Sequence, residues 1–294
     1  MEMLLRARSS TALDFDVSTT RYRGQNALAL ARISMLAYKD NAVMERAIAD
    51  KFAFTHFKVF KAGETEAYLI SDSEKIIVTF RGSDQVKDWL NNIDIDLVGG
   101  PLGGKVHEGF MRMFHGVWRE LQLEIRALKT AASQQNRSLP LWMTGHSLGA
   151  ALATLATAYL REKDQPVQGL YSFGSPRVGD RTFARHFDSD FGDKTFRIVN
   201  KNDIVTRLPP RALSYSHVGQ LYFFDGSGQL QTDSSVWYRF LDSVKVHVAD
   251  LFDMDFRGWK ITILGPMCRQ HSAIATAMEP ECWIRIGCWA GWRL

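Results

Sequence analysis

Residues 145–149 read Gly-His-Ser-Leu-Gly and lie between two segments of opposite structural preference. Residues 138–144 form a short apolar run typical of a buried strand, and residues 150–160 are rich in Ala and Leu and contain no Gly or Pro. A serine on a tight strand-to-helix turn projects its hydroxyl away from the backbone, and flanking glycines let strand and helix approach closely. The pattern therefore predicts a nucleophile at Ser147. The alternative is a glycine-rich turn with an incidental serine.

The length and composition favour one α/β domain spanning residues 1–294. The chain has 294 residues, of which 46% are apolar and 23% charged, so it can bury a substantial core. No linker or repeat divides it. The net charge of +4 comes from basic and acidic residues spread along the chain, which gives no indication of nucleic-acid binding. No apolar run is long enough to predict a transmembrane segment.

The cysteines and the amino-terminal residues bear on the compartment. The three cysteines lie within the last 27 residues, and the apolar run in residues 1–6 is too short for a signal peptide. An odd number of cysteines without a leader argues against a disulfide framework and for a reducing compartment. We therefore expect a cytoplasmic protein, with leaderless secretion left open.

Helical and strand patterns alternate along the chain. Helices are predicted at residues 26–39, 41–51 and 107–128. Strands are predicted at residues 54–61, 65–71, 75–80, 139–144, 168–173 and 194–199, with a hairpin formed by 220–224 and 228–231 around Asp225 and Gly226. Strands that alternate with helices imply a mostly parallel sheet covered on both faces.

Asp203 is the first candidate partner for the serine. A serine hydroxyl needs a base to take its proton and an acid to orient that base. In hydrolases built on such a sheet these partners follow the serine in the order acid, then histidine. Asp203 follows the strand at 194–199, so its carboxylate can face the same edge of the sheet as Ser147. The alternative is an aspartate that only caps a turn.

An acyl-transfer reaction also needs two backbone N–H groups that receive the developing oxyanion. Leu148 supplies one by its place after the serine. Ser83 is the candidate for the second, because it follows a predicted central strand and Gly82 permits the turn. An ordinary strand-ending turn is the alternative reading of this segment.

Six motifs occur in an order that resembles the fungal-type class 3 lipases. They are Phe-Arg-Gly-Ser at 80–83, Asp-Trp-Leu-Asn-Asn at 88–92, Val-His-Glu-Gly-Phe at 106–110, Gly-His-Ser-Leu-Gly-Ala at 145–150, Phe-Gly-Ser-Pro-Arg-Val-Gly at 173–179 and Asn-Asp-Ile-Val-Thr-Arg-Leu-Pro-Pro at 202–210. The resemblance covers about residues 26–224.

The resemblance implies an α/β-hydrolase fold with a short helical lid and an esterase that acts mostly on acylglycerols. It implies that Ser147 is the nucleophile, Asp203 the remote acid, and Ser83 and Leu148 the oxyanion hole. It also places four lid or substrate-binding residues in the segment 84–92, where lid opening would expose apolar surface at a lipid–water interface. These are Asp84, Val86, Trp89 and Leu90. No cofactor or metal is implied.

The resemblance places the catalytic base near the carboxyl terminus. His271 resembles the family's terminal Asp-His-Ser element, although Gln270 replaces the acidic residue and the helix expected next is altered. His217 also matches a family segment, but not as the base, and His247 lies in a helical or strand pattern. His107 and His146 belong to motifs that we interpret as structural.

The tail from 268 to 294 departs from the family and allows other interpretations. It holds four potential zinc ligands, in a spacing that is not a common zinc motif. They are Cys268, His271, Cys282 and Cys288. Its tryptophans could anchor the chain at a membrane interface or cover core. They are Trp283, Trp289 and Trp292.

Taken together, the sequence predicts a serine carboxylic-ester hydrolase of the triacylglycerol lipase or esterase type. The alternatives are a phospholipase A1, a feruloyl-type esterase, and a catalytically silent lipid-binding member of the fold. The sequence does not indicate an oligomeric state.

Overall fold

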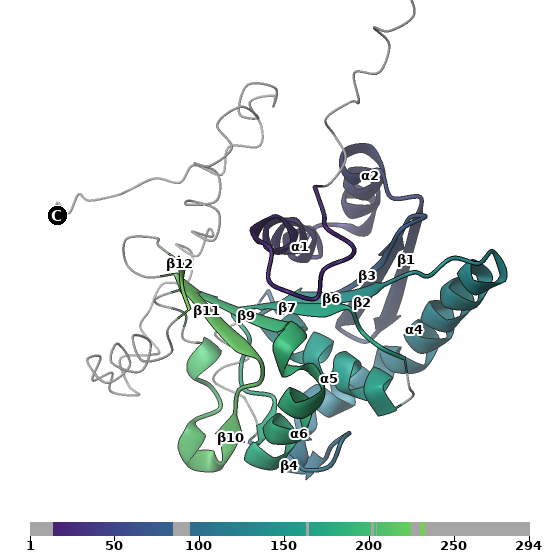
Figure 1. Ribbon diagram of the computed structural model, residues 1–294. Coiled ribbons are helices and arrows are strands. Elements are labelled where there is room, and N and C mark those ends of the chain that lie inside the picture. Colours follow the sequence, from purple (N-terminus) through teal and green to yellow (C-terminus); the bar gives the residue numbers. More distant parts are fainter. Residues whose placement is uncertain are drawn as a thin grey trace, which may run out of the picture.

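The computed structural model describes residues 14–84, 95–162, 165–200, 203, 205–224 and 230–232. In this part of the chain, five helices cover a central sheet on both faces (Figure 1). On one face lie α1 (Gly24–Leu36) and α2 (Asn41–Phe52); on the other lie α4 (Glu108–Gln134), α5 (Leu148–Glu162) and α6 (Arg181–Phe191). Short 3₁₀ turns are η1 (Gly192–Lys194), η2 (Val205–Arg207) and η3 (Arg211–Leu213).

The central sheet has eight described strands in the order β1-β2-β3-β6-β7-β9-β11-β12. Their bounds are β1 (His56–Ala62), β2 (Thr65–Ser71), β3 (Ile76–Phe80), β6 (Leu141–His146), β7 (Gly169–Phe173), β9 (Thr195–Asn200), β11 (Gln220–Phe224) and β12 (Leu230–Gln231). From β3 to β11 neighbouring strands are parallel, whereas β1, β2 and β12 pair antiparallel. The predicted mostly parallel sheet is thus confirmed, and so is the antiparallel pair formed by β11 and β12.

The register of the parallel strands brings their carboxyl ends to one edge. Phe80 of β3 pairs with Gly145 of β6, and His146 of β6 pairs with Phe173 of β7. Phe173 in turn pairs with Ile198 of β9. The residues that follow these four strands therefore meet at the same edge of the sheet, as the sequence interpretation requires.

Apolar side chains fill both sides of the sheet. The five residues of β3 and the five of β7 are all buried, which is typical of strands covered by helices on both faces. On the α1 side the Trp142 ring meets Phe15 edge to face, with ring centroids 5.0 Å apart. Thr144 is polar but satisfied, because its hydroxyl donates to the Tyr171 carbonyl at 2.8 Å. The central strands are thus held in a dry, hydrogen-bonded core.

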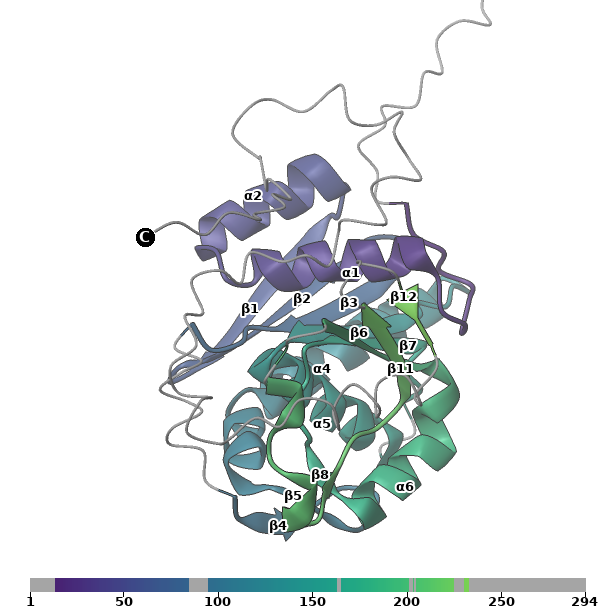
Figure 2. The ribbon, with the colours of Figure 1, turned by 90° about the vertical axis from the view of Figure 1, so that its left-hand side faces the viewer.

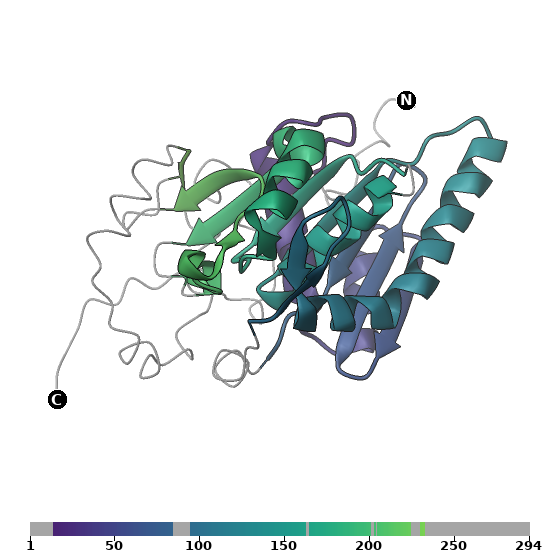
Figure 3. The same ribbon diagram turned by 90° about the horizontal axis from the view of Figure 1, so that it is seen from below.

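A second, smaller antiparallel sheet lies on the side of the main sheet opposite α1 and α2 (Figure 2). Its order is β10-β8-β5-β4, and its strands are β4 (Leu97–Gly99), β5 (Lys105–His107), β8 (Gly179–Asp180) and β10 (Tyr215–Ser216). The sequence analysis did not predict this sheet or α6. Seen from below, α4 runs along the face of the main sheet opposite α1 and α2 (Figure 3).

Helix α4 is longer than predicted. It begins where the His107 ring nitrogen accepts a hydrogen bond from Phe110 N.

Within the described ranges, none of the helices combines the length and the apolar character needed to cross a bilayer.

Candidate active site

Ser147 occupies the single residue between β6 and α5. Its φ of 56° is left-handed, a conformation that costs a residue with a Cβ about 1–3 kcal/mol and concentrates at functional sites. Two backbone hydrogen bonds hold the turn: Ser147 N donates to Phe173 O at 2.9 Å, and Ala150 N donates to Ser147 O at 3.0 Å. The predicted strand-to-helix turn is therefore present, with the serine at its strained position.

Glycine is required on both sides of the serine because strand and helix are in contact there. A Cβ on Gly145 would lie 2.4 Å from the carbonyl carbon of Gly149. A Cβ on Gly149 would lie 2.2 Å from the carbonyl oxygen of Phe80, at the end of β3. Both distances are far below van der Waals contact. The turn is thus packed against the neighbouring strand as well as against its own.

The side chain of Ser147 is buried, with a relative exposure of 1%. Its Oγ has no hydrogen-bond partner among the described residues. A buried hydroxyl left unpaired costs about 1–3 kcal/mol, so such a group calls for an explanation. The described part of the chain supplies no proton acceptor for this hydroxyl.

Asp203 is buried just beyond β9, with a relative exposure of 4%. Its Oδ1 accepts a hydrogen bond from Val205 N at 3.0 Å, while Thr206 Oγ1 donates to its backbone carbonyl at 2.8 Å. Burial raises the pKa of Asp203 to about 7, although the N–H groups of Val205 and Thr206 act in the opposite direction. A carboxylate desolvated in this way gains from a positively charged partner beside it, which lowers its pKa again.

The segment Phe173–Gly174 connects the surroundings of the two candidate residues. Phe173 O accepts from Ser147 N, and Gly174 N donates to Ile198 O at 2.9 Å. Gly174 has a φ of 58°, and a Cβ there would lie 2.4 Å from Asp203 Oδ2. The aspartate thus occupies the space that the missing side chain leaves. The sequence analysis included Gly174 only within the motif at 173–179, and the preceding buried strand was the available signal.

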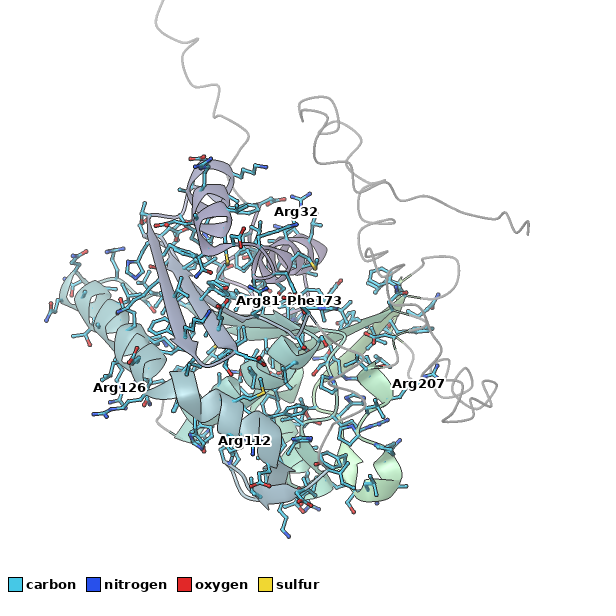
Figure 4. All side chains as sticks on the ribbon, turned by 180° about the vertical axis from the view of Figure 1, so that it is seen from behind. Arg32, Arg81, Arg112, Arg126, Phe173 and Arg207 are labelled. Atoms are coloured by element: carbon cyan, nitrogen blue, oxygen red, sulfur yellow. The ribbon has the colours of Figure 1, made fainter. Side chains whose placement is uncertain are left out.

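The candidate oxyanion residues lie on elements that touch. Leu148 is the first residue of α5, where backbone N–H groups have no intrahelical partner. Ser83 follows β3 by three residues, and a Cβ on Gly149 would lie 3.1 Å from the carbonyl carbon of Arg81. Figure 4 labels Arg81, the residue after β3, and Phe173, the last residue of β7; β3 and β7 are the two neighbours of β6 in the sheet. The loop that carries Ser83 is therefore packed on the first turn of α5.

The predicted lid falls largely outside the described residues. Asp84 is described; it is exposed and accepts a hydrogen bond from Arg81 at 2.5 Å. Val86, Trp89 and Leu90 lie outside the described residues.

Three histidines near the site are engaged elsewhere. His107 stacks on Phe110 at the start of α4, with ring centroids 4.0 Å apart. His146 Nδ1 lies 2.9 Å from the hydroxyl of Tyr38, and burial lowers its pKa to about 4. His217 Nε2 lies 2.8 Å from the carbonyl oxygen of Thr206, and burial together with nearby arginines holds its pKa well below the usual value. These packed positions fit structural roles.

The preferred base His271 and the alternative His247 lie outside the described residues. The same holds for Cys268, Cys282 and Cys288, the other candidate zinc ligands. In the part of the chain that is described, no group of three or more His, Cys, Asp or Glu residues is arranged to hold a metal ion.

A comparison with protein families matches residues 77–213 to the family described as Lipase (class 3). A secreted mono- and diacylglycerol lipase 1 of Fusarium solani is 38% identical over 177 residues, covering 58% of this chain and 50% of the relative. A lipase of Rhizomucor miehei is 35% identical over 191 residues, covering 63% of this chain and 48% of the relative. The chain thus spans about half the length of these curated relatives.

The structure is also similar to solved lipase structures. A deletion mutant of the Rhizomucor miehei lipase propeptide complex has a TM-score of 0.58 and 30% identity. The match covers 72% of each chain. The predicted α/β-hydrolase fold is confirmed by this likeness to fungal lipases.

The comparisons correct one prediction. The chain was expected to be cytoplasmic, but the Fusarium solani relative is named as secreted. That expectation is wrong, because the relatives point to an extracellular location. The inference failed because it relied on the amino-terminal residues and on an odd cysteine count.

Proposed function

Because this chain belongs to the class 3 lipase family, we propose that it is a serine carboxylic-ester hydrolase that acts on acylglycerols. The observation that carries the proposal is the left-handed Ser147 at the end of the central strand β6, with buried Asp203 two strands away at the same edge. Serine hydrolases on this sheet need that placement, since the nucleophile and the acid must flank one histidine.

In the proposed reaction, Ser147 Oγ attacks the ester carbonyl carbon as His271 accepts the hydroxyl proton. Asp203 holds the histidine in the tautomer that can accept this proton, and stabilises the resulting imidazolium. The N–H groups of Ser83 and Leu148 donate to the oxyanion of the tetrahedral intermediate. His271 then returns its proton to the departing alcohol, and the acyl group stays on the serine. Water, activated by the same histidine, releases the carboxylic acid.

The relatives support an acylglycerol substrate more than a small soluble ester. The Fusarium solani relative is named as a mono- and diacylglycerol lipase, and the Rhizomucor miehei relative as a lipase. We propose that the substrate is an ester lipid met at a lipid–water interface, with Trp89 of the proposed lid close to the acyl chain.

Hydrolysis of nitrophenyl esters with short and long acyl chains tests the activity, with Ser147→Ala as the matched control. Turnover of both esters by the parent, lost in the variant, is expected. Emulsified diacylglycerol and phosphatidylcholine then separate an acylglycerol lipase from a phospholipase. A folded parent that hydrolyses none of these esters contradicts the proposal and favours a catalytically silent lipid-binding protein.

A further inference from the structure

A buried carboxylate on β2 lies one strand away from the candidate oxyanion loop. The side chain of Glu66 is 9% exposed. Its Oε1 accepts a hydrogen bond from Lys61 Nζ at 2.6 Å, and its Oε2 accepts one from the hydroxyl of Tyr68 at 2.7 Å. Burial pushes the pKa of Glu66 upward, but these bonds and the neighbouring positive charges outweigh it, so the pKa lies below its ordinary value. Glu66 is therefore a charged group inside the sheet.

This carboxylate holds Arg81, the first residue after β3. Arg81 Nη1 lies 3.4 Å from Glu66 Oε2, and Arg81 N donates to the Glu66 carbonyl oxygen at 3.0 Å. The other end of the guanidinium donates to Asp84 Oδ2 at 2.5 Å. Arg81 and Asp84 are the two ends of a four-residue loop that contains Gly82 and Ser83. One arginine thus ties both ends of the loop to the neighbouring strand.

The loop so held has little room to move. A Cβ on Gly82 would lie 2.0 Å from the hydroxyl oxygen of Tyr38 and 2.7 Å from the carbonyl oxygen of His146. On another side, the loop contacts Gly149 in the first turn of α5. The backbone at Gly82 is thus enclosed on these sides, and the ion pairs of Arg81 hold the two ends of the loop.

Stability alone gives weak grounds for a charge at this position. Glu66 is 9% exposed, but its partners Lys61 and Arg81 are 62% and 25% exposed. An ion pair with a solvent-exposed partner contributes only about 0–1 kcal/mol to stability. The other residues of β2 are buried, and an apolar side chain would suit the strand at this place. A geometric role for Glu66 explains the charge better than a general contribution to stability does.

We propose that Glu66 is a positioning residue for the oxyanion hole: through Arg81 and Asp84 it fixes the backbone N–H of Ser83 relative to the first turn of α5. The inference rests on the proposed function and deepens it. Glu66 does not touch the substrate, so its effect falls on the transition state and not on substrate binding. Removing one oxyanion donor costs about 10²–10³ in rate, and a displaced donor should cost part of that.

The test compares Glu66→Gln with the parent on a nitrophenyl ester. We expect kcat to fall about 10- to 100-fold while KM changes less than about twofold. Affinity for an alkyl trifluoromethyl ketone should fall by the same factor as kcat/KM, since its adduct with the serine places an oxyanion in the same hole. Glu66→Asp, which keeps the charge, should recover part of the loss.

Glu124→Gln is the matched control. Glu124 lies on α4 and pairs with Lys58 and with His56, at 3.2 Å from the His56 ring, away from the loop. The control should keep kcat within about twofold of the parent, because the partners of Glu124 lie on β1 and not on the loop that carries Ser83. Equal losses of kcat in both variants would show that the effect is not specific to the loop.

Two results overturn the inference. One is a folded Glu66→Gln protein with parental kcat and parental affinity for the ketone; the other is a loss of activity that only follows a smaller folded fraction. If Glu66→Gln does not fold, the same two measurements, kcat and affinity for the ketone, are made on Tyr68→Phe. That variant removes one hydrogen bond to the Glu66 carboxylate. A parent that neither hydrolyses esters nor binds the ketone contradicts the proposed function instead, so the two failures are distinguishable.

Discussion

At the residue scale, the backbone of Ser147 carries a cost that a purely structural turn would avoid. Its φ of 56° strains any residue with a Cβ, whereas glycine adopts this conformation freely. The strain is about 1–3 kcal/mol, a sizeable part of the stability of a typical domain. The serine at this position is therefore better explained by reactivity than by folding.

Replacing Ser147 by glycine and by alanine separates the backbone strain from the chemistry. Both variants should lose ester hydrolysis. Ser147→Gly should be more stable than Ser147→Ala by ~1 kcal/mol, because only alanine keeps a Cβ at a φ of 56°. Urea unfolding measures the difference. Equal stabilities would contradict the strained geometry without bearing on the activity.

His146 should make the protein sensitive to acid. Its pKa in the folded protein is about 4, below the ~6.5 of an unfolded chain. Between these values the unfolded chain binds a proton that the folded chain does not, so the free energy of unfolding falls as the pH drops from 6.5 to 4. Between pH 7 and pH 4.5, the free energy of unfolding should fall by ~1–3 kcal/mol less in His146→Asn than in the parent. Urea unfolding at the two pH values measures this difference.

The control for this comparison is His115→Asn, on the exposed face of α4. It should keep the parental loss of stability toward acid. An unchanged pH dependence in His146→Asn would show that the His146 imidazole does not contribute to it.

At the element scale, the sequence predicted elements whose apolar pattern is long enough to show a period. The helices at the amino terminus and the strands around Ser147 and Asp203 agree with the structure to within a few residues at most boundaries. The smaller sheet was missed because its strands have two or three residues, and their pairing depends on contacts remote in sequence. Helix α6 had a usable signal, since Phe183, Phe187 and Phe191 recur at helical spacing behind the N-cap Asp180.

A substitution at Gly174 tests whether the residue after β7 positions the Asp203 carboxylate. Gly174→Ala should lower kcat by ~10² or more, because the new methyl group would lie 2.4 Å from Asp203 Oδ2 and must displace the carboxylate. Gly63→Ala is the control. Gly63 has almost the same φ, 57°, but no atom lies within 4 Å of a Cβ there.

Both glycine variants should lose ~1 kcal/mol of stability from backbone strain, and only Gly174→Ala should lose activity. Thermal unfolding and the ester assay together give this comparison. Parental kcat in Gly174→Ala would mean that the position of Asp203 does not matter to the reaction.

At the scale of the whole molecule, the candidate site lies where the parallel strands of the central sheet end. The sequence predicted which strand ends meet, because the carboxyl ends of parallel strands share one edge, and Ser147 and Asp203 lie there. It could not reveal that Gly174 and Glu66 shape the site, since those contacts join residues far apart in the chain. The extent of the domain over residues 1–294, the lid and the identity of the base stay predictions.

An alanine series at three histidines addresses the base. His271→Ala should lose about 10³-fold or more in kcat, whereas His247→Ala should keep parental activity. His217→Ala should mainly lose stability, because its half-buried ring contacts the Thr206 carbonyl oxygen at 2.8 Å. Parental activity in His271→Ala would remove that residue from the mechanism. A large loss of kcat in a stable His217 or His247 variant would instead identify that histidine as the base.

Reaction with a fluorophosphonate followed by peptide mass spectrometry tests the central claim most directly, because the probe phosphonylates only a serine activated as a nucleophile. The account predicts one equivalent of label on Ser147 in the parent, and none in folded Ser147→Ala. A folded parent that takes up no label, or carries it on another residue, would contradict the account.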